Sequence, residues 1–273
     1  MKYVDIKPLT NVPPFRKIAL ATWRKPGDPQ IYGTIDIDLT KAYEWRENYK
    51  RNNPASPKIT VTHMVARAWG VILAKYPDLN GYIRFGKIYL RNSVDGFFQV
   101  AVNHASGRDD LSGIQIKELD KKNVAEIAKV TQEKVNALRE NKNTEIQKTV
   151  RMLNLFPSLV IRFLLFLSSF IGYTLNIKPI GIPEDAFGAF MISNVGSLGL
   201  DIAYAPLVPY SRVPMVIIIG AAKKRPVVID GEIKIREIVK LSLTIDHRFC
   251  DGALGAKMAR ELHQVFEHPG EYF

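Results

Sequence analysis

Residues 241–252 read Leu-Ser-Leu-Thr-Ile-Asp-His-Arg-Phe-Cys-Asp-Gly. Apolar and polar side chains alternate over residues 241–245, as they do on a strand with one buried face. Asp251 and Gly252 then mark a turn in which a helix begins. His247 is therefore expected at the end of a strand, in a strand-to-helix turn. Because an imidazole titrates near neutral pH, His247 could accept and return a proton there.

The rest of the chain alternates between strand and helix patterns. Asp38 is placed to cap a helix that runs to about Asn52, and Thr60 to cap a helix over residues 61–76. Further strands are expected at residues 31–38, 82–85, 87–91, 97–103, 114–119, 188–193, 215–221, 227–229, 233–235 and 239–245. Further helices are expected at residues 120–143, capped by Asp120, and at 253–268. This order predicts an α/β fold, with a two-layer mixed β-sheet and flanking helices, in one domain over residues 1–273.

The composition is that of a folded globular protein. Hydrophobic residues make up 47% of the 273 residues and charged residues 24%, which excludes a disordered chain. The single cysteine, Cys250, excludes an intrachain disulfide. The N-terminus lacks an apolar stretch of signal-peptide length, so a cytoplasmic protein is expected. The net charge of +11 favours a polyanionic partner, but it does not choose among nucleic acid, a membrane surface and a phosphate-rich cofactor.

Residues 153–175 are more apolar than the rest of the chain. These 23 residues carry one charge, Arg162, and Pro157 interrupts them. The uninterrupted uncharged part, residues 163–177, is shorter than the roughly 20 residues that a transmembrane helix needs. Two interpretations stay open: a buried helical hairpin or oligomer contact, and an interfacial segment or the wall of an acyl-chain site. Lys148, Arg151 and Lys178 would suit anionic lipid headgroups, so a peripheral membrane-surface contact is one hypothesis.

A second candidate motif lies at residues 190–199, where a strand runs into a turn punctuated by glycines. Attack on a thioester builds a negative tetrahedral oxygen, and the hydroxyl of Ser193 at this strand end could stabilise it. A serine that only shapes the turn is the alternative. The other histidines, at positions 63, 104, 263 and 268, lack metal-ligand spacing, so they are expected to be structural or at the surface, and no metal site is predicted.

Four sequence motifs, in the order in which they stand along the chain, resemble those of one family. Residues 246–252 resemble the Asp-His-Arg-x-x-Asp-Gly signature of dihydrolipoamide acyltransferases, the catalytic cores of 2-oxo acid dehydrogenase complexes. Chloramphenicol acetyltransferase shares the His-x-x-x-Asp-Gly part. Residues 192–196 resemble the family's Ile-Ser-Asn-Leu-Gly, residues 16–19 its Arg-Lys-x-Ile-Ala start, and Pro77 with Asn80 its Pro-x-x-Asn helix end. The resemblance covers nearly the whole chain except about residues 144–183.

The resemblance implies a fold, a site and a reaction. The fold is chloramphenicol acetyltransferase-like, and three subunits form a homotrimer with each active site between two of them. His247 would deprotonate a thiol or hydroxyl acceptor, which attacks the acyl thioester of coenzyme A, while Ser193 of the neighbouring subunit hydrogen-bonds the oxyanion. Asp251 would hold the turn, pairing with Arg16, and Gly252 would allow close approach. Acyl-CoA is then the phosphate-rich partner, and no nucleic acid is expected.

Three departures from the family's pattern leave the acceptor open. No lipoyl domain precedes the expected core, residues 144–183 form an apolar insertion, and the chain ends at Phe273 without a cage-forming tail, so a free trimer is expected. The chain is therefore either a stand-alone acyl-CoA acyltransferase, a dehydrogenase-complex core that uses lipoyl groups of a separate protein, or a non-catalytic trimeric scaffold or lipid-associated module. Intact His247, Ser193 and Asp251 disfavour the last.

Overall fold

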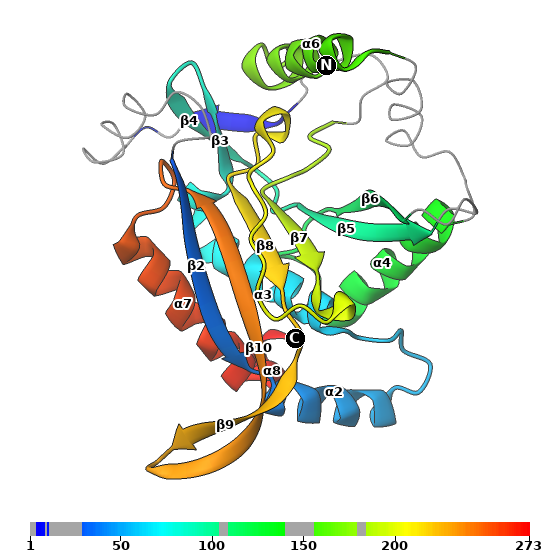
Figure 1. Cartoon of the computed structure of the whole chain (residues 1–273), viewed down its shortest axis with the longest axis vertical. Helices are drawn as coiled ribbons and strands as arrows, with labels where there is room; N and C mark the ends of the chain where they lie inside the picture. Colours follow the sequence, from blue (N-terminus) through cyan, green and yellow to red (C-terminus); the bar gives the residue numbers. More distant parts are fainter. Residues whose placement is uncertain (1–3, 9, 11–28, 104–108, 140–155, 179–183) are drawn as a thin grey trace.

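A mixed seven-stranded β-sheet organises the molecule (Figure 1). The computed structural model describes residues 4–8, 10, 29–103, 109–139, 156–178 and 184–273. Strand β7 runs parallel to β5 and β8, and the other pairs are antiparallel. The strands, in sheet order, are β2 (Gln30–Asp38), β10 (Glu232–Asp246), β8 (Met215–Ile219), β7 (Phe190–Asn194), β5 (Gly96–Asn103) and β6 (Asp109–Ile116), with β9 (Lys223–Ile229) paired to β10 off this path.

Helices cover one face of this sheet and enclose the main core. Leu241 and Leu243 of β10 face the helices, where they join Met64, Trp69 and Ile72 in one buried cluster. The helices are α2 (Thr40–Asn52), α3 (Val61–Lys75), α4 (Val124–Arg139), α7 (Gly252–Glu267) and α8 (Pro269–Tyr272). The predicted two-layer mixed fold with flanking helices is therefore confirmed.

The opposite face of the sheet is covered by irregular chain. Val216 and Ile218 of β8 pack there against Leu207 and Val213, which come from the segment before β8. A second, three-stranded sheet has the order β1 (Ile6–Pro8), β4 (Lys87–Arg91) and β3 (Gly81–Arg84). Short single turns occur at η1 (Pro77–Leu79), η3 (Gly196–Leu198) and η4 (Pro209–Ser211).

Of the three predicted capping residues Asp38, Thr60 and Asp120, the first two bond the first turn of a helix, as predicted. The carboxylate of Asp38 accepts a hydrogen bond from the backbone nitrogen of Thr40 at 2.9 Å, where α2 begins. Thr60 caps α3, and its backbone nitrogen donates to Nδ1 of His63 at 3.2 Å in a reciprocal capping box. The third prediction was wrong, because α4 begins after Asn123 and not at Asp120.

Asn123 starts α4 because its side chain and that of Glu126 satisfy each other's backbone. The Glu126 nitrogen donates to Asn123 Oδ1 at 2.9 Å, and the Asn123 nitrogen donates to Glu126 Oε2 at 2.8 Å. The strand predicted at residues 114–119 is also shifted, since β6 ends at Ile116. The two strands predicted at residues 233–235 and 239–245 are one, because β10 changes partner at Ile238, which faces both Lys223 and Asp38.

The apolar stretch before β7 forms a helix on the surface. Helix α6 (Ser158–Ser169) continues into a π-helical turn, η2 (Phe170–Thr174). Phe163 and Phe166 are 61% and 63% exposed, so a buried helical hairpin is the wrong interpretation of this stretch in the single chain. Among the described residues, no helix has both the length and the apolar character needed to cross a bilayer.

Candidate active site

His247 follows directly on the last residue of β10, as the sequence predicts. Its ring nitrogen Nδ1 lies 2.7 Å from the carbonyl oxygen of Cys250. A carbonyl oxygen can only accept, so Nδ1 carries the proton of the neutral ring. The basic lone pair of that ring is then on Nε2. The backbone nitrogen of His247 also donates to the carbonyl oxygen of Pro29 at 2.7 Å, which ties the turn to the start of β2.

An ion pair that the sequence motif did not reveal flanks His247 on both sides. Asp246 accepts from Nε of Arg248 at 2.9 Å and from its backbone nitrogen at 3.0 Å. A second guanidinium nitrogen of Arg248 reaches the other carboxylate oxygen at 2.5 Å. Both side chains are almost fully buried, at 4% and 6% exposed. This two-pronged contact fixes the backbone on either side of the histidine. The Asp-x-Arg spacing within the motif was the signal that could have predicted it.

Asp251 holds the other end of the turn by capping α7. Its backbone is extended, and its side chain accepts from the backbone nitrogen of Leu254 at 2.8 Å. An N-cap carboxylate satisfies a helix N–H group that has no partner within the helix. The predicted partner, Arg16, lies outside the described residues, so that pairing stays a prediction. A Cβ at Gly252 would meet nothing within 4 Å, so packing within this chain does not require glycine there.

Ser193 lies near the end of β7, in the second motif. The side-chain nitrogen Nδ2 of the next residue, Asn194, donates to Oγ1 of Thr62 at 3.1 Å, which attaches the motif to α3. A Cβ at Gly196 would lie 2.4 Å from the carbonyl oxygen of Gly220. The turn after Ser193 therefore requires glycine because the neighbouring backbone leaves no room for a side chain.

A single chain keeps Ser193 and His247 apart. Ser193 pairs with Ile218 of β8, and Ile218 pairs with Ser242 of β10. His247 lies five residues beyond Ser242 along the chain. With strand spacings of about 4.8 Å and a rise of about 3.3 Å per residue, the two Cα atoms are roughly 15–20 Å apart. The two motifs lie at opposite ends of the sheet, so a reacting atom cannot touch both residues of one chain.

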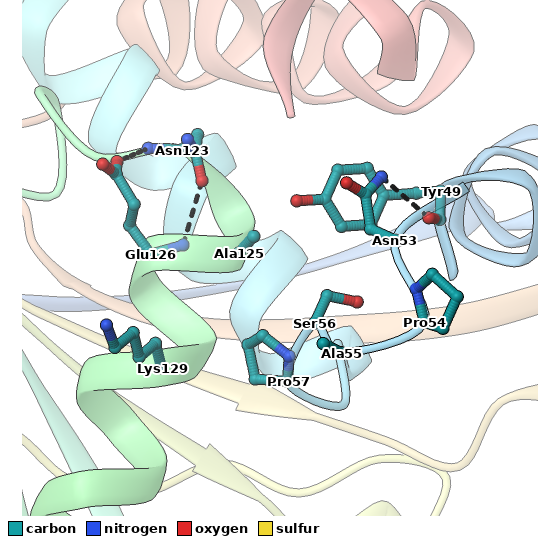
Figure 2. A pocket seen from close by; sticks show the side chains of 10 residues that line it. All are labelled: Tyr49, Asn53, Pro54, Ala55, Ser56, Pro57, Asn123, Ala125, Glu126 and Lys129. Carbon is teal, nitrogen blue, oxygen red and sulfur yellow. Dashed lines mark hydrogen bonds between the residues drawn. The ribbon is translucent and has the colours of Figure 1, made fainter. Parts of the chain in front are cut away.

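One surface depression is separate from both motifs. Figure 2 shows it between the end of α2, the loop after it and the start of α4, with Tyr49, Pro57 and Lys129 in its lining. Two pairs of its lining residues are hydrogen-bonded: Asn123 bonds Glu126, and Asn53 Nδ2 donates to the Tyr49 carbonyl oxygen at 3.1 Å. None of its lining residues belongs to either motif.

A second depression lies beside the His247 turn. It is formed between β2 and α7 and includes Cys250, Asp251 and Gly252 of the motif. Most of its other residues are apolar or small, among them Ile31, Gly33, Ile35, Leu243, Gly255, Ala256 and Ala259. Across the part of the chain that the structure describes, no three His, Cys, Asp or Glu side chains converge in a way that could hold a metal ion.

The fold and the two motifs define an acyltransferase. The chain belongs to the family of 2-oxoacid dehydrogenase acyltransferase catalytic domains, whose model matches residues 20–149 and 182–273. The resemblance stated from the motifs is therefore confirmed, and so is the enzyme class. The gap in the match, residues 150–181, contains helix α6 and lies within the insertion predicted from the sequence.

Known acyltransferases resemble this chain in sequence and in fold. The dihydrolipoyllysine-residue acetyltransferase component of the pyruvate dehydrogenase complex from Rickettsia felis is 24% identical over 244 residues, which are 88% of this chain and 48% of that protein. Dihydrolipoamide acetyltransferase from Azotobacter vinelandii matches with a TM-score of 0.65 and 20% identity, over 97% of this chain and 93% of that one. Chloramphenicol acetyltransferase matches with a TM-score of 0.57 and 11% identity, over 96% and 100%. This chain spans about half the length of the curated relative.

Proposed function

We propose that the protein transfers an acyl group between coenzyme A and the thiol of a dihydrolipoyl group. The hydrogen bond from His247 Nδ1 to the Cys250 carbonyl oxygen carries this proposal, because it makes Nε2 the basic atom of the ring. The names of the curated relatives supply the acceptor, since they are dihydrolipoyllysine-residue acetyltransferases.

The reaction needs one base and one oxyanion donor. Nε2 of His247 takes the proton of the acceptor thiol, and the thiolate attacks the carbonyl carbon of the acyl thioester. The carbonyl oxygen becomes negative, and the hydroxyl of Ser193 donates a hydrogen bond to it. The tetrahedral centre then releases the thiolate of coenzyme A, which takes the proton back from His247. Asp251 and the Asp246–Arg248 pair keep the His247 turn in place throughout.

The spacing of the site residues supports these roles. The Azotobacter enzyme was studied for the role of a serine, a histidine and an asparagine in its catalytic mechanism, and that asparagine stands four residues after the histidine. Asp251 stands four residues after His247 in this chain. An aspartate can cap the helix as an asparagine does, so the substitution preserves the support of the turn.

A homotrimer would complete the site. Ser193 and His247 lie at opposite ends of one chain's sheet, so the two residues must come from different copies to act together. The ribbon of β9 and β10, which projects beyond the sheet in Figure 1, offers a surface for such a contact. Val228 and Ile233 face each other across it and are 73% and 77% exposed. Exposed apolar pairs on a projecting ribbon favour burial against another subunit.

The acceptor is tested by giving the purified protein acetyl-CoA together with dihydrolipoamide, small alcohols and small amines in one mixture. The acylated products are then separated and quantified. We expect acyl-dihydrolipoamide to form fastest. Faster acylation of an alcohol or amine would rule out the thiol acceptor, and no product with any acceptor would rule out the enzyme.

A further inference from the structure

Helix α6 presents a continuous apolar face to solvent. At 100° per residue, five exposed side chains fall within an arc of about 120°. Two of them, Phe166 and Phe170, stack with ring centroids 6.3 Å apart. The five are 37–63% exposed and are Val160, Phe163, Phe166, Leu167 and Phe170. A continuous apolar surface of this kind that is exposed to solvent marks a contact site.

The other side of the segment is attached to the body of the protein. Ser169 at the end of α6 accepts a hydrogen bond from Nε of Arg212 at 3.2 Å. In the π-helical turn, Tyr173 is buried and donates to Asp185 at 3.0 Å, and the carbonyl oxygen of Thr174 accepts from Arg84 at 2.6 Å. Figure 1 shows α6 at one end of the molecule, beyond the seven-stranded sheet. The apolar face is therefore held outward in one orientation.

In the described segment 156–178, both charged side chains are positive. Residues 146–183 contain Lys148, Arg151, Arg162 and Lys178 and no acidic residue. The two that lie in the described part, Arg162 and Lys178, are exposed. Arg162 lies about 100° from Phe163 around the helix, at the edge of the apolar arc. An apolar face with cations at its edge is the pattern of a helix that lies in the headgroup region of a membrane.

We propose that α6 docks the protein on an anionic lipid bilayer. The aromatic face would enter the headgroup boundary, and Arg162 and Lys178 would contact lipid phosphates. The 12 residues of α6 span only about 18 Å, so the helix lies on the surface and does not cross it. The family model does not match residues 150–181, so this contact adds to the catalytic function and does not depend on it.

Charge argues against a second copy as the occupant. A contact between the α6 faces of two copies would bring Arg162 of both copies into one interface, and α6 itself carries no carboxylate to pair with it. An anionic lipid surface supplies the missing negative charge and an apolar boundary together.

Vesicle flotation with the full chain tests the proposal. We expect binding to vesicles of phosphatidylglycerol and phosphatidylcholine, little binding to phosphatidylcholine alone, and weaker binding as salt rises. The double substitution Phe163→Glu with Phe166→Glu should reduce binding by about tenfold or more, whereas Phe163→Leu with Phe166→Leu should retain it. Arg162→Glu should weaken binding more than Lys129→Glu, which makes the same charge change at an exposed site on α4.

Two results would overturn the proposal: no binding to anionic vesicles, and vesicle binding that the glutamate pair leaves unchanged. In the second case, a change in the mass of that variant by light scattering would make the face a contact between copies. Loss of the thermal transition would show that the glutamate pair fails to fold. In that case Arg162→Glu is compared with Lys129→Glu, and equal vesicle binding by these two variants would refute the proposal.

Discussion

At the scale of single residues, the His247 turn is held from three directions. The Cys250 carbonyl oxygen orients the ring, the Asp246–Arg248 pair fixes the backbone on both sides, and Asp251 begins the next helix. Each contact is local, so the turn keeps its geometry within one chain. The proposed base is therefore oriented by its own chain, before a substrate or a second subunit binds.

Removal of the imidazole should nearly abolish turnover. General-base catalysis contributes about 10²–10⁴ in rate, so His247→Ala should lower kcat for acyl transfer by that factor. The matched control is His263→Ala, which removes an exposed histidine on α7 and should leave kcat unchanged. Full activity of folded His247→Ala protein would contradict the assignment of the base.

Loss of the Asp251 cap should lower stability as well as activity. Asp251→Ala should reduce the free energy of unfolding by about 1 kcal/mol, because the Leu254 nitrogen at the start of α7 loses its acceptor. Asp251→Asn can still accept that hydrogen bond and should remain close to wild type in urea denaturation. Equal destabilisation by both substitutions would show that the carboxylate charge, and not the cap, is what matters.

At the scale of secondary structure, caps and partners set the ends of the elements. Helix α3 begins where the sequence predicts, because Thr60 and His63 satisfy each other's backbone within four residues. The start of α4 was wrongly predicted at Asp120 because several residues before this helix are able to cap it. Only the reciprocal bonds of Asn123 and Glu126 distinguish Asn123 as the residue that caps it. Strand β10 runs through a polar stretch because β9 and β2 pair with it in succession.

The α3 cap makes stability depend on pH. Burial lowers the pKa of His63 from 6.5 to about 4, so the folded protein holds the ring neutral while the unfolded chain takes up a proton. Neutral His63 makes its full contribution to the free energy of unfolding above pH 6.5. That contribution, up to about 3 kcal/mol, is lost as the pH falls toward 4.

His63→Gln should remove this pH dependence and keep the capping box, because glutamine also accepts from the Thr60 nitrogen. Urea denaturation at pH 7 and pH 4.5 measures the effect as the difference from wild type. His263→Gln, on the exposed side of α7, serves as the control and should show the wild-type slope. If the free energy of unfolding of His63→Gln changes with pH as much as that of the wild type, His63 is not the group that titrates.

At the scale of the whole molecule, the two residues of the proposed catalytic pair lie far apart. The pairing of β7, β8 and β10 places Ser193 and His247 at opposite ends of one sheet. The proposed reaction then needs at least two copies of the chain, and we propose that the exposed pair Val228 and Ile233 on the ribbon of β9 and β10 lies in their contact.

Mixed assemblies should recover activity that neither parent variant has. Ser193→Ala alone should lower kcat by about 10²–10³, and His247→Ala alone by at least as much. In trimers assembled from equal amounts of both, about one quarter of the inter-subunit sites combine an intact Ser193 with an intact His247, so about one quarter of wild-type activity should return. The variants are mixed during refolding or co-expressed, and acyl transfer is measured. No recovery in mixed particles of the correct mass would place both residues of a site in one chain.

The sequence by itself determined the local parts of this protein. Alternation along residues 241–245, the Asp-Gly turn and the Thr60 cap each depend on neighbours a few residues apart, so the strand, the turn with His247 and helix α3 could be predicted. The motif order also determined the family. Tertiary structure alone decided that the Asp246–Arg248 pair is buried, that β10 is one strand, and that α6 turns its aromatic face outward. These features depend on backbone and side-chain partners far apart in the chain, which only the folded chain brings together.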